Sequence, residues 1–306
     1  MKTTTVFFGT EQFASEILQS LIDSDSFDIQ MVVTQPDRPV GRKQEIEKSP
    51  VKLVAEKYNF PIKQPSSKTS LTNLQSEIIN LKLNIVCQYG LIIPKEVLEA
   101  PELGSINVHP SLLPKYRGAS PIQSAIINGE TKTGVSIMLM DAKMDHGDIL
   151  AQQEVNIDPD DTFEVLHNKL LEISKPLLVE TLKKYLKNKT KPQVQNDNVA
   201  TFCKIFTRAD GQVDWKKSAQ EIYNLYRGLT PWPGIWTTAE GIRLKLLKIA
   251  PTNSNGVPGQ IIADKNQLLV GCGKNAIEIL ELQPEGKKPM TGIAFKNGHK
   301  DIIKLI

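Results

Sequence analysis

An asparagine and a histidine stand two residues apart in the segment 105–109, which the sequence predicts to be a buried strand. Asn107 and His109 therefore share one face of the strand and emerge where it ends. In an open α/β sheet, ligands bind outside the carboxyl ends of the strands. The rigid turn PSLLP follows at 110–114 and offers backbone donors and acceptors to a polar ligand. The pattern favours an active site, although a histidine hydrogen-bonded beside an ordinary loop would look the same.

A second polar segment, MDAKMDHGD at 140–148, forms an acidic loop between two expected strands. One of its aspartates could reach His109. An amide and an imidazole can donate to an oxygen that becomes negative in a tetrahedral intermediate, while a carboxylate orients the ring and helps remove a proton from an attacking amine. Because no serine or cysteine stands with a matched base, we expect direct transfer between two bound substrates rather than a covalent intermediate.

The elements that must position these residues alternate along the first 150 residues. Such alternation predicts a doubly wound parallel sheet, followed by two later strands and one long helix. The expected strands are 4–8, 29–33, 84–88, 105–108, 135–139 and 149–155, and the expected helices are 11–22, 50–58, 71–81, 119–127 and 161 to about 186.

The last hundred residues have a different character. After one expected helix at 218–227, short β-prone runs recur between glycine and proline turns, which indicates a small OB-like barrel. A polar, lysine-rich stretch with a proline precedes this part and is typical of a linker. We therefore expect a catalytic domain over 1–188, a basic linker over 189–205 and a second domain over 206–306.

Composition and motif absences exclude several classes of protein. The 306 residues are 40% hydrophobic and 23% charged, as in ordinary globular proteins. No apolar run approaches the roughly 20 residues of a membrane helix, so we expect a soluble cytoplasmic chain, working as a monomer. A glycine-rich nucleotide fingerprint is missing after the first expected strand. The cysteines and histidines are too scattered for a disulfide framework or a metal site: Cys87, Cys203, Cys272, His109, His146, His167 and His299.

Charge is unevenly divided along the chain. The total is +3, yet residues 208–306 carry +5 and the first 207 residues carry −2. Five lysines also lie within 183–191. A basic second half behind a basic connector suits a protein that touches a polyanion, although a solvated surface has the same composition.

The segment NVHPSLLPKYRG at 107–118 resembles the signature of the folate-dependent formyltransferases. The segments FGTEQFA at 8–14 and QYGLIIP at 88–94 resemble other parts of that family. The resemblance implies a Rossmann-like formyltransferase fold, 10-formyltetrahydrofolate as co-substrate and no metal. It also implies Asn107, His109 and Asp145 as the catalytic residues. Asp145 is matched because it precedes the His-Gly-Asp step, although the family usually has glycine, leucine and threonine where Lys143, Met144 and His146 stand. The implied folate contacts are Tyr89, Leu91, Ser111, Leu112, Leu113 and Pro114.

The formyl acceptor is implied by other segments. The stretch QPDRPVGRKQEIEKSPVK at 35–52 resembles the loop by which some members enter the acceptor stem of methionyl initiator tRNA. Arg42 falls at the matching position, beside Lys43, and an arginine fork can pair with phosphate or a base edge. The segments 204–215, 230–236 and 282–290 resemble the second domain of those members, which lies against the tRNA; Lys287 and Lys288 are its expected phosphate contacts. The expected reaction therefore carries formyl from 10-formyltetrahydrofolate to the α-amine of methionyl initiator tRNA.

Three other functions stay open at this point. A sugar-nucleotide formyltransferase would share the catalytic residues but would not need the insertion at 41–52. A 10-formyltetrahydrofolate hydrolase would use water as acceptor and would need no tRNA surface. A tRNA-binding protein without activity would not require Asn107, His109 and Asp145 together.

Overall fold

The chain forms two compact units in a computed structural model that describes residues 2–41 and 44–306. The first unit comprises Met1–Pro121, Thr133–Asn156 and Asn168–Cys203. The second comprises Ile122–Lys132, Ile157–His167 and Lys204–Ile306. The chain therefore passes between the units several times, and two short segments that precede residue 168 belong to the second unit.

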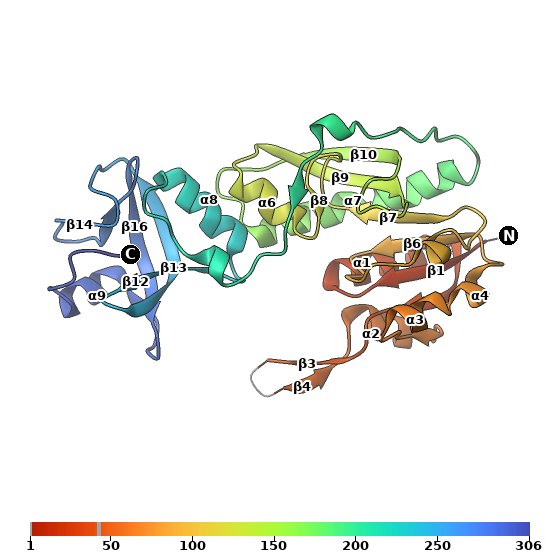
Figure 1. The fold of residues 1–306 in the computed structure, drawn as a ribbon, viewed down its shortest axis with the longest axis horizontal. Coiled ribbons are helices and arrows are strands. Elements are labelled where there is room, and N and C mark those ends of the chain that lie inside the picture. Colours follow the sequence, from red (N-terminus) through yellow and green to blue (C-terminus); the bar gives the residue numbers. More distant parts are fainter. Residues whose placement is uncertain (1, 42–43) are drawn as a thin grey trace. The chain divides into compact units, whose positions relative to one another are not determined.

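The first unit is built on a seven-stranded sheet. Figure 1 labels its strands β10, β9, β7, β6 and β1. Its order is β10-β9-β7-β6-β1-β2-β5, and each pair from β7 to β5 is parallel, whereas β9 runs antiparallel to β7. The predicted doubly wound parallel sheet is confirmed, with an antiparallel addition at one edge. The strands are β1 (Thr3–Gly9), β2 (Phe27–Val33), β5 (Ile62–Lys63), β6 (Leu83–Cys87), β7 (Ser105–His109), β9 (Lys132–Leu139) and β10 (Ile149–Asn156).

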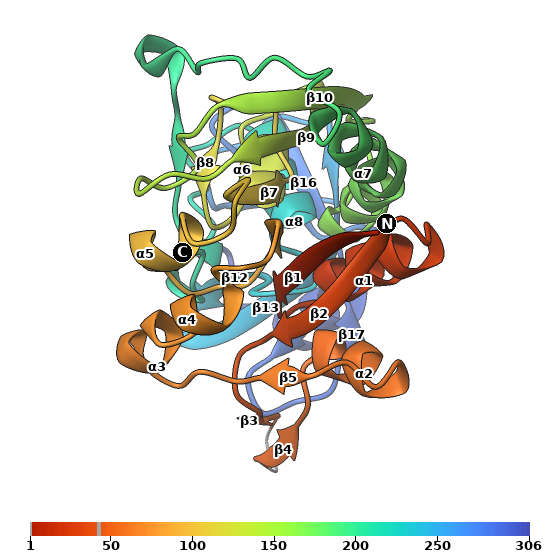
Figure 2. The same cartoon turned by 90° about the vertical axis from the view of Figure 1, so that its right-hand side faces the viewer.

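Helices cover both faces of this sheet (Figure 2). The helices are α1 (Gln12–Asp23), α2 (Pro50–Lys57), α3 (Lys68–Thr72), α4 (Gln75–Ile78), α5 (Lys95–Leu98) and α7 (Phe163–Tyr185). Helix α6 (Pro121–Ile127) belongs to the second unit from Ile122 on. Alternate residues of β1 point to opposite faces. Val6 and Phe8 therefore pack in one buried cluster with the apolar side chains of α3, α4 and α5. In Figure 2, α1, α2 and α7 lie on the other side of the sheet.

Local sequence explains where these helices begin. Phe13, Ile17, Leu18 and Leu21 of α1 are fully buried, as their spacing predicts. Ser49 caps α2 by accepting a hydrogen bond from the Lys52 backbone N–H, and proline follows it at the first helical position. The single helix expected over 71–81 is wrong: the structure has the short helices α3 and α4 there, and a Ser67–Ser70 capping box starts the first of them at Lys68.

An insertion after β2 forms a hairpin of β3 (Arg38–Val40) and β4 (Glu45–Glu47), which pair antiparallel. It extends away from the sheet in Figures 1 and 2. All three residues of β4 are exposed. The hairpin buries little apolar surface of its own, so its position depends on how its base is held.

The second unit holds an antiparallel sheet of order β12-β13-β16-β15-β14, with β17 beside β16. Its strands are β12 (Ile235–Ala239), β13 (Ile242–Thr252), β14 (Ile261–Ile262), β15 (Leu269–Gly271), β16 (Ala276–Pro284) and β17 (Met290–Thr291). The helices α8 (Ala219–Leu229) and α9 (Gly292–Gly298) pack on this sheet. Trp215 lies in its buried core, whereas Trp232 is 58% exposed.

The stretch 189–205 follows the first unit closely. Gln193 exchanges two backbone hydrogen bonds with Ile149 at the start of β10, at 2.8 and 2.9 Å. Further along, β11 (Phe202–Cys203) pairs with β8 (Arg117–Gly118). The remaining elements are the 3₁₀ turns Asp197–Val199 and Ala209–Gly211. Among the described residues, no helix is long and apolar enough to cross a bilayer.

Candidate active site

Strand β7 presents Asn107 and His109 at the carboxyl end of the parallel sheet. Val86 of β6 and Met138 of β9 flank Asn107, so the strand is fixed from both sides. Both polar side chains are buried, His109 at 4% exposure and Asn107 at 9%. The Asn107 side-chain amide has no hydrogen-bond partner within residues 2–41 and 44–306. Its donor is therefore free to bind a substrate oxygen.

The His109 ring lies between two oxygen acceptors. Its Nε2 is 3.0 Å from the Tyr116 carbonyl oxygen, and because a carbonyl only accepts, this nitrogen donates. Its Nδ1 is 3.6 Å from Oδ1 of Asp145, which is an ion-pair distance rather than a hydrogen bond. The imidazole therefore lies between the Tyr116 carbonyl and the Asp145 carboxylate.

Asp145 is held on its other side by the backbone of β8. Its Oδ2 accepts a hydrogen bond of 2.8 Å from the N–H of Gly118. Gly118 has φ of +119°, and a Cβ there would lie 2.3 Å from the Cys203 carbonyl oxygen, so only glycine fits. The glycine of the KYRG segment thus brings a backbone donor to the Asp145 carboxylate.

The loop between β9 and β10 is tightly folded where it carries Asp145. Asp145 itself has φ of +49°, a region that costs a residue with a side chain free energy of about 1 kcal/mol or more. A Cβ on Gly147 would lie 2.0 Å from the Leu139 carbonyl oxygen, so the loop returns directly against its own strand. Surrounding contacts must hold this conformation.

The expected folate contacts fall into two groups by burial. Tyr89 is only 2% exposed and its ring meets that of Phe8 edge to face at 5.6 Å. Burial raises the pKa of Tyr89 to about 12, so the ring stays neutral. Leu91, in contrast, is 46% exposed. In the part of the chain that is described, the N–H groups of Gly90, Leu91 and Ile92 donate to no protein group, which leaves backbone donors for a polar heterocycle.

The hydroxyls of Ser111 and Ser136 hold the turn at 111–114 through its backbone groups. Ser111 is fully buried and its hydroxyl donates to the Lys115 carbonyl at 2.6 Å. The N–H of Leu113 donates to the Ser136 hydroxyl at 3.0 Å, and its side chain is buried. Leu112 and Pro114 are half-buried. The turn therefore has a fixed shape and offers ligands parts of these two side chains and its backbone.

The residues expected to contact tRNA come from different parts of the chain. Arg42 and Lys43 lie outside the described residues. Lys287 and Lys288 are exposed in the turn between β16 and β17, in the second unit. The side-chain amide of Gln283 donates a hydrogen bond to the Lys287 carbonyl at 2.8 Å and so shapes the turn.

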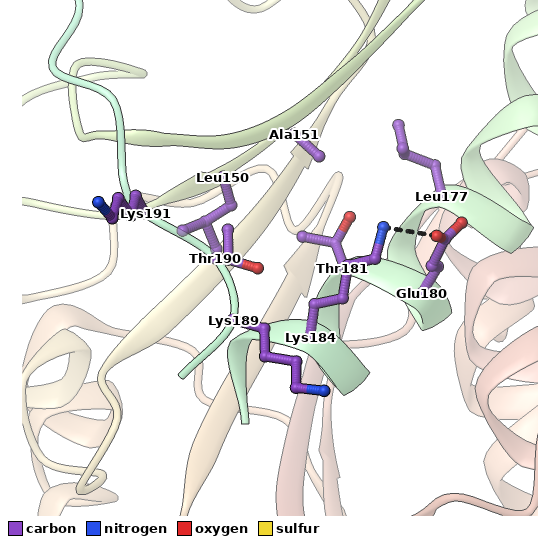
Figure 3. Close-up of a pocket in the computed structure, with 9 residues that line it drawn as sticks. All are labelled: Leu150, Ala151, Leu177, Glu180, Thr181, Lys184, Lys189, Thr190 and Lys191. Atoms are coloured by element: carbon purple, nitrogen blue, oxygen red, sulfur yellow. Dashed lines mark ion pairs between the residues drawn. The ribbon is translucent and has the colours of Figure 1, made fainter. Parts of the chain in front are cut away.

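An open cavity of about 300 Å³ lies in the first unit away from these residues (Figure 3). Residues of β10, α7 and 189–191 line it, and Lys184 pairs there with Glu180 at 2.6 Å. None of the predicted site residues takes part. Separately, the described residues include no group of three or more His, Cys, Asp and Glu that could hold a metal ion.

Sequence reasoning assigned no role to two buried side chains beside the catalytic loop, Arg117 and Gln195. Gln195 contacts the loop that carries Asp145 although it lies 50 residues later, inside the expected linker. No motif marks it. Only the three-dimensional packing of 193–199 on the first unit makes it visible.

The sequence matches known families along nearly its whole length. Residues 1–182 match the formyl transferase family and residues 205–300 match the formyl transferase C-terminal domain. A methionyl-tRNA formyltransferase from Caldanaerobacter subterraneus is 43% identical over 298 residues, which cover 96% of each chain. The methionyl-tRNA formyltransferase of Staphylococcus epidermidis is 41% identical over 302 residues, covering 97% of each chain.

Solved structures share the fold at lower identity. A Helicobacter canadensis N-formyltransferase in complex with folinic acid and dTDP-3-aminofucose superposes with a TM-score of 0.66 and 20% identity, over 91% of this chain and 99% of that one. HypX from Aquifex aeolicus in complex with tetrahydrofolic acid gives 0.64 and 16%, over 98% of this chain and 48% of the other.

Proposed function

The chain belongs to the formyl transferase family, and we propose that it transfers the formyl group of 10-formyltetrahydrofolate to the α-amine of methionyl initiator tRNA. The observation that carries this proposal is the identity of 43% and 41% with two methionyl-tRNA formyltransferases over nearly the full chain. The solved sugar formyltransferase is only 20% identical, so its likeness is one of fold.

The chemistry we assign to Asn107, His109 and Asp145 follows from their positions. The neutral amine attacks the formyl carbon, a C–N bond forms, and the carbonyl oxygen becomes negative. The Asn107 amide and a ring N–H of His109 are the donors for this oxyanion. The bond to N10 of the folate then breaks; the amine loses one proton and N10 gains one. Asp145 holds the His109 ring and assists this proton movement.

The 3.6 Å separation between Asp145 and His109 is compatible with this role. Catalytic hydrogen bonds are often long without substrate and tighten when it binds. Without substrate, the Nε2–H of His109 donates to the Tyr116 carbonyl, which sets the ring plane. In the proposed reaction this N–H passes to the oxyanion, while Nδ1 stays facing Asp145. A small movement of the carboxylate would complete the pair.

For the folate, we propose that the turn 111–114 and the loop 88–93 hold the co-substrate. The free N–H groups of Gly90, Leu91 and Ile92 suit the polar edge of a pteridine ring. Leu112 and Pro114 offer apolar surface. Tyr89 would act from within the core, since its carbonyl accepts from Thr10 and Gln35 and so fixes this loop.

For the tRNA, we propose that Arg42 and Lys43 meet the acceptor end and that Lys287 and Lys288 contact phosphates. Binding through phosphates should weaken as salt rises. We further propose that the chain works in the cytoplasm as a monomer, with residues 1–188 as catalytic domain, 189–205 as linker and 206–306 as tRNA-contacting domain. Analytical ultracentrifugation at working concentration tests the monomer.

Transfer of labelled formyl from 10-formyltetrahydrofolate tests the reaction. Methionyl initiator tRNA, methionyl elongator tRNA and an amino-sugar nucleotide serve as parallel acceptors. We expect label on the initiator tRNA and little on the other two. Labelling of the sugar alone, or release of formate with no labelled acceptor, would replace the proposed acceptor by a sugar or by water.

A further inference from the structure

Gln195 clamps the loop that carries the catalytic carboxylate, and we propose that it is a positioning residue for Asp145. This inference rests on the proposed function, in which Asp145 acts through His109. Gln195 is 8% exposed, and each hydrogen-bonding site of its amide has a partner. It touches no reacting atom itself.

The amide nitrogen of Gln195 holds the loop at two points. It donates to the Asp145 carbonyl oxygen at 3.0 Å and to the Gly147 carbonyl oxygen at 2.7 Å. These two carbonyls bracket His146, so the clamp fixes the turn in which Asp145 adopts its positive φ. Without it, the backbone strain at Asp145 favours relaxation to another conformation.

The amide oxygen of Gln195 is fixed in turn by Arg117. It accepts from Nε at 3.1 Å and from Nη2 at 2.9 Å, and a guanidinium cannot act as acceptor, so the orientation of the amide is determined. Arg117 Nη2 also donates to Asp197 at 2.7 Å, and this hydrogen bond lowers the pKa of Asp197. The side chain of Arg117 is almost completely buried.

Both the side-chain carboxylate and the backbone carbonyl of Asp145 therefore depend on β8. Gly118 donates its N–H to the carboxylate, and the preceding residue, Arg117, acts through Gln195 on the carbonyl of the same aspartate. Rigid support of this kind keeps a catalytic group in its productive geometry, and outer hydrogen bonds typically change activity by about 10- to 100-fold.

Gln195 lies in the connector between the two matched family regions. It lies after the matched formyl transferase region, which ends at residue 182, and before the matched C-terminal domain, which begins at 205. The connector is therefore part of the catalytic apparatus. A chain cut after residue 182 would keep Asn107, His109 and Asp145 but lose the clamp.

The first test measures steady-state formyl transfer by the full chain. Gln195→Met removes every hydrogen bond of the amide at similar length, and we expect kcat to fall about 10- to 100-fold with little change in KM for either substrate. Gln193→Met is the matched control, because its side chain is exposed on the same segment. Equal kcat for Gln195→Met and the control would overturn the proposal.

A double-mutant cycle separates positioning from a general loss of structure. If Gln195 acts through Asp145, Gln195→Met should cost less than about twofold when added to Asp145→Asn, because the carboxylate it positions is already gone. An undiminished loss in that background would contradict the proposal. Gln195→Glu supplies a second variant that keeps an acceptor for Arg117, so folding is preserved while both donors are lost.

A substrate-free measurement keeps this inference separate from the proposed function. The amide proton of Gly118, observed by NMR in glycine-labelled protein, reports its hydrogen bond to the Asp145 carboxylate. We expect an upfield shift in Gln195→Met and none in Gln193→Met. An unchanged Gly118 signal would overturn the positioning role whatever the acceptor is, whereas a wild-type chain that formylates no tRNA would overturn the proposed function alone.

Discussion

The loop that carries Asp145 and the β3–β4 hairpin both extend from the sheet of the first unit, but they are held in different ways. The loop that carries Asp145 is contacted by three residues that are distant in the sequence: Gly118, His109 and Gln195. The described residues of the hairpin strands are exposed, and the contacts that anchor the hairpin lie near its base. There Arg38 pairs with Glu11 at 3.2 Å. Lys52 bonds to Asp37 at 2.6 Å and to Gln64 at 2.9 Å.

The difference matches the tasks that we assign to the two regions. Bond formation needs donors placed to within a fraction of an ångström, so its residues are buried and bonded on several sides. A surface element that contacts a large polyanion needs length and positive charge, and it is sufficient that its point of attachment to the sheet is fixed. Changes in the loop should therefore lower kcat, whereas changes at the hairpin base should raise KM for tRNA.

The largest effect is expected for Asp145→Asn. The substitution keeps the size of the side chain but removes the charge beside His109, and kcat should fall about 10³-fold. Steady-state kinetics with both substrates varied measures this. Circular dichroism and thermal unfolding check that the fold is kept. If the substitution raised KM for tRNA and left kcat unchanged, the proposed difference between the Asp145 loop and the hairpin would be contradicted.

Asn107→Ala should have a smaller effect, because it removes one donor to the oxyanion and leaves His109 in place. We expect kcat to fall about 100-fold. Asn107→Asp, which replaces the donor by a negative acceptor of equal size, should be at least as impaired. If Asn107→Asp retained most of the activity, the amide would have no role as a donor.

Lys52→Met tests the hairpin base. Its side chain is 14% exposed, and its ammonium bonds to Asp37 and Gln64. Its loss should loosen the hairpin and raise KM for tRNA about tenfold, equal to about 1.4 kcal/mol. kcat at saturating tRNA should stay the same. Lys63→Met is the matched control, since Lys63 pairs with Glu77 at the surface. A fall in kcat without a rise in KM would contradict the assignment.

The smallest effect concerns how the stability contributed by Asp37, at the base of the hairpin, depends on pH. Hydrogen bonds from Lys52, and then Gln64, lower the pKa of Asp37 below its ordinary value near 4. A lowered pKa means that the carboxylate contributes stability in full above about pH 4 and loses it as the pH falls further. Asp37→Asn should therefore lower Tm at pH 7, and the difference from wild type should shrink below pH 4. If the difference in Tm between wild type and Asp37→Asn grew as the pH fell, the prediction would be contradicted.

Much of the catalytic edge could be predicted from the sequence. Short apolar runs predicted β1 and β7, and a period-3.6 pattern predicted α1. The two-residue spacing at the end of β7 predicted that Asn107 and His109 share one face. These are local signals, set by neighbours within one element. The family resemblance added Asp145, which the structure places 3.6 Å from His109.

What the sequence could not give depends on contacts between distant segments. Gln195 lies in a polar, lysine-rich stretch that looks like a linker, and its clamp on Asp145 exists only because 193–199 folds back on the first unit. The two-residue strand β8 is too short for any pattern, yet its pairing with β11 fixes Gly118. Tertiary packing of this kind leaves no periodic trace.

The central claim is that His109 is the buried donor of a formyl transfer centre and is not needed to hold the tRNA. Formyl transfer by His109→Ala, measured together with its affinity for methionyl initiator tRNA, tests it most directly. The account predicts a fall in kcat of about 10³-fold with tRNA affinity unchanged. Near-normal turnover, or a loss explained by tRNA binding alone, would contradict it.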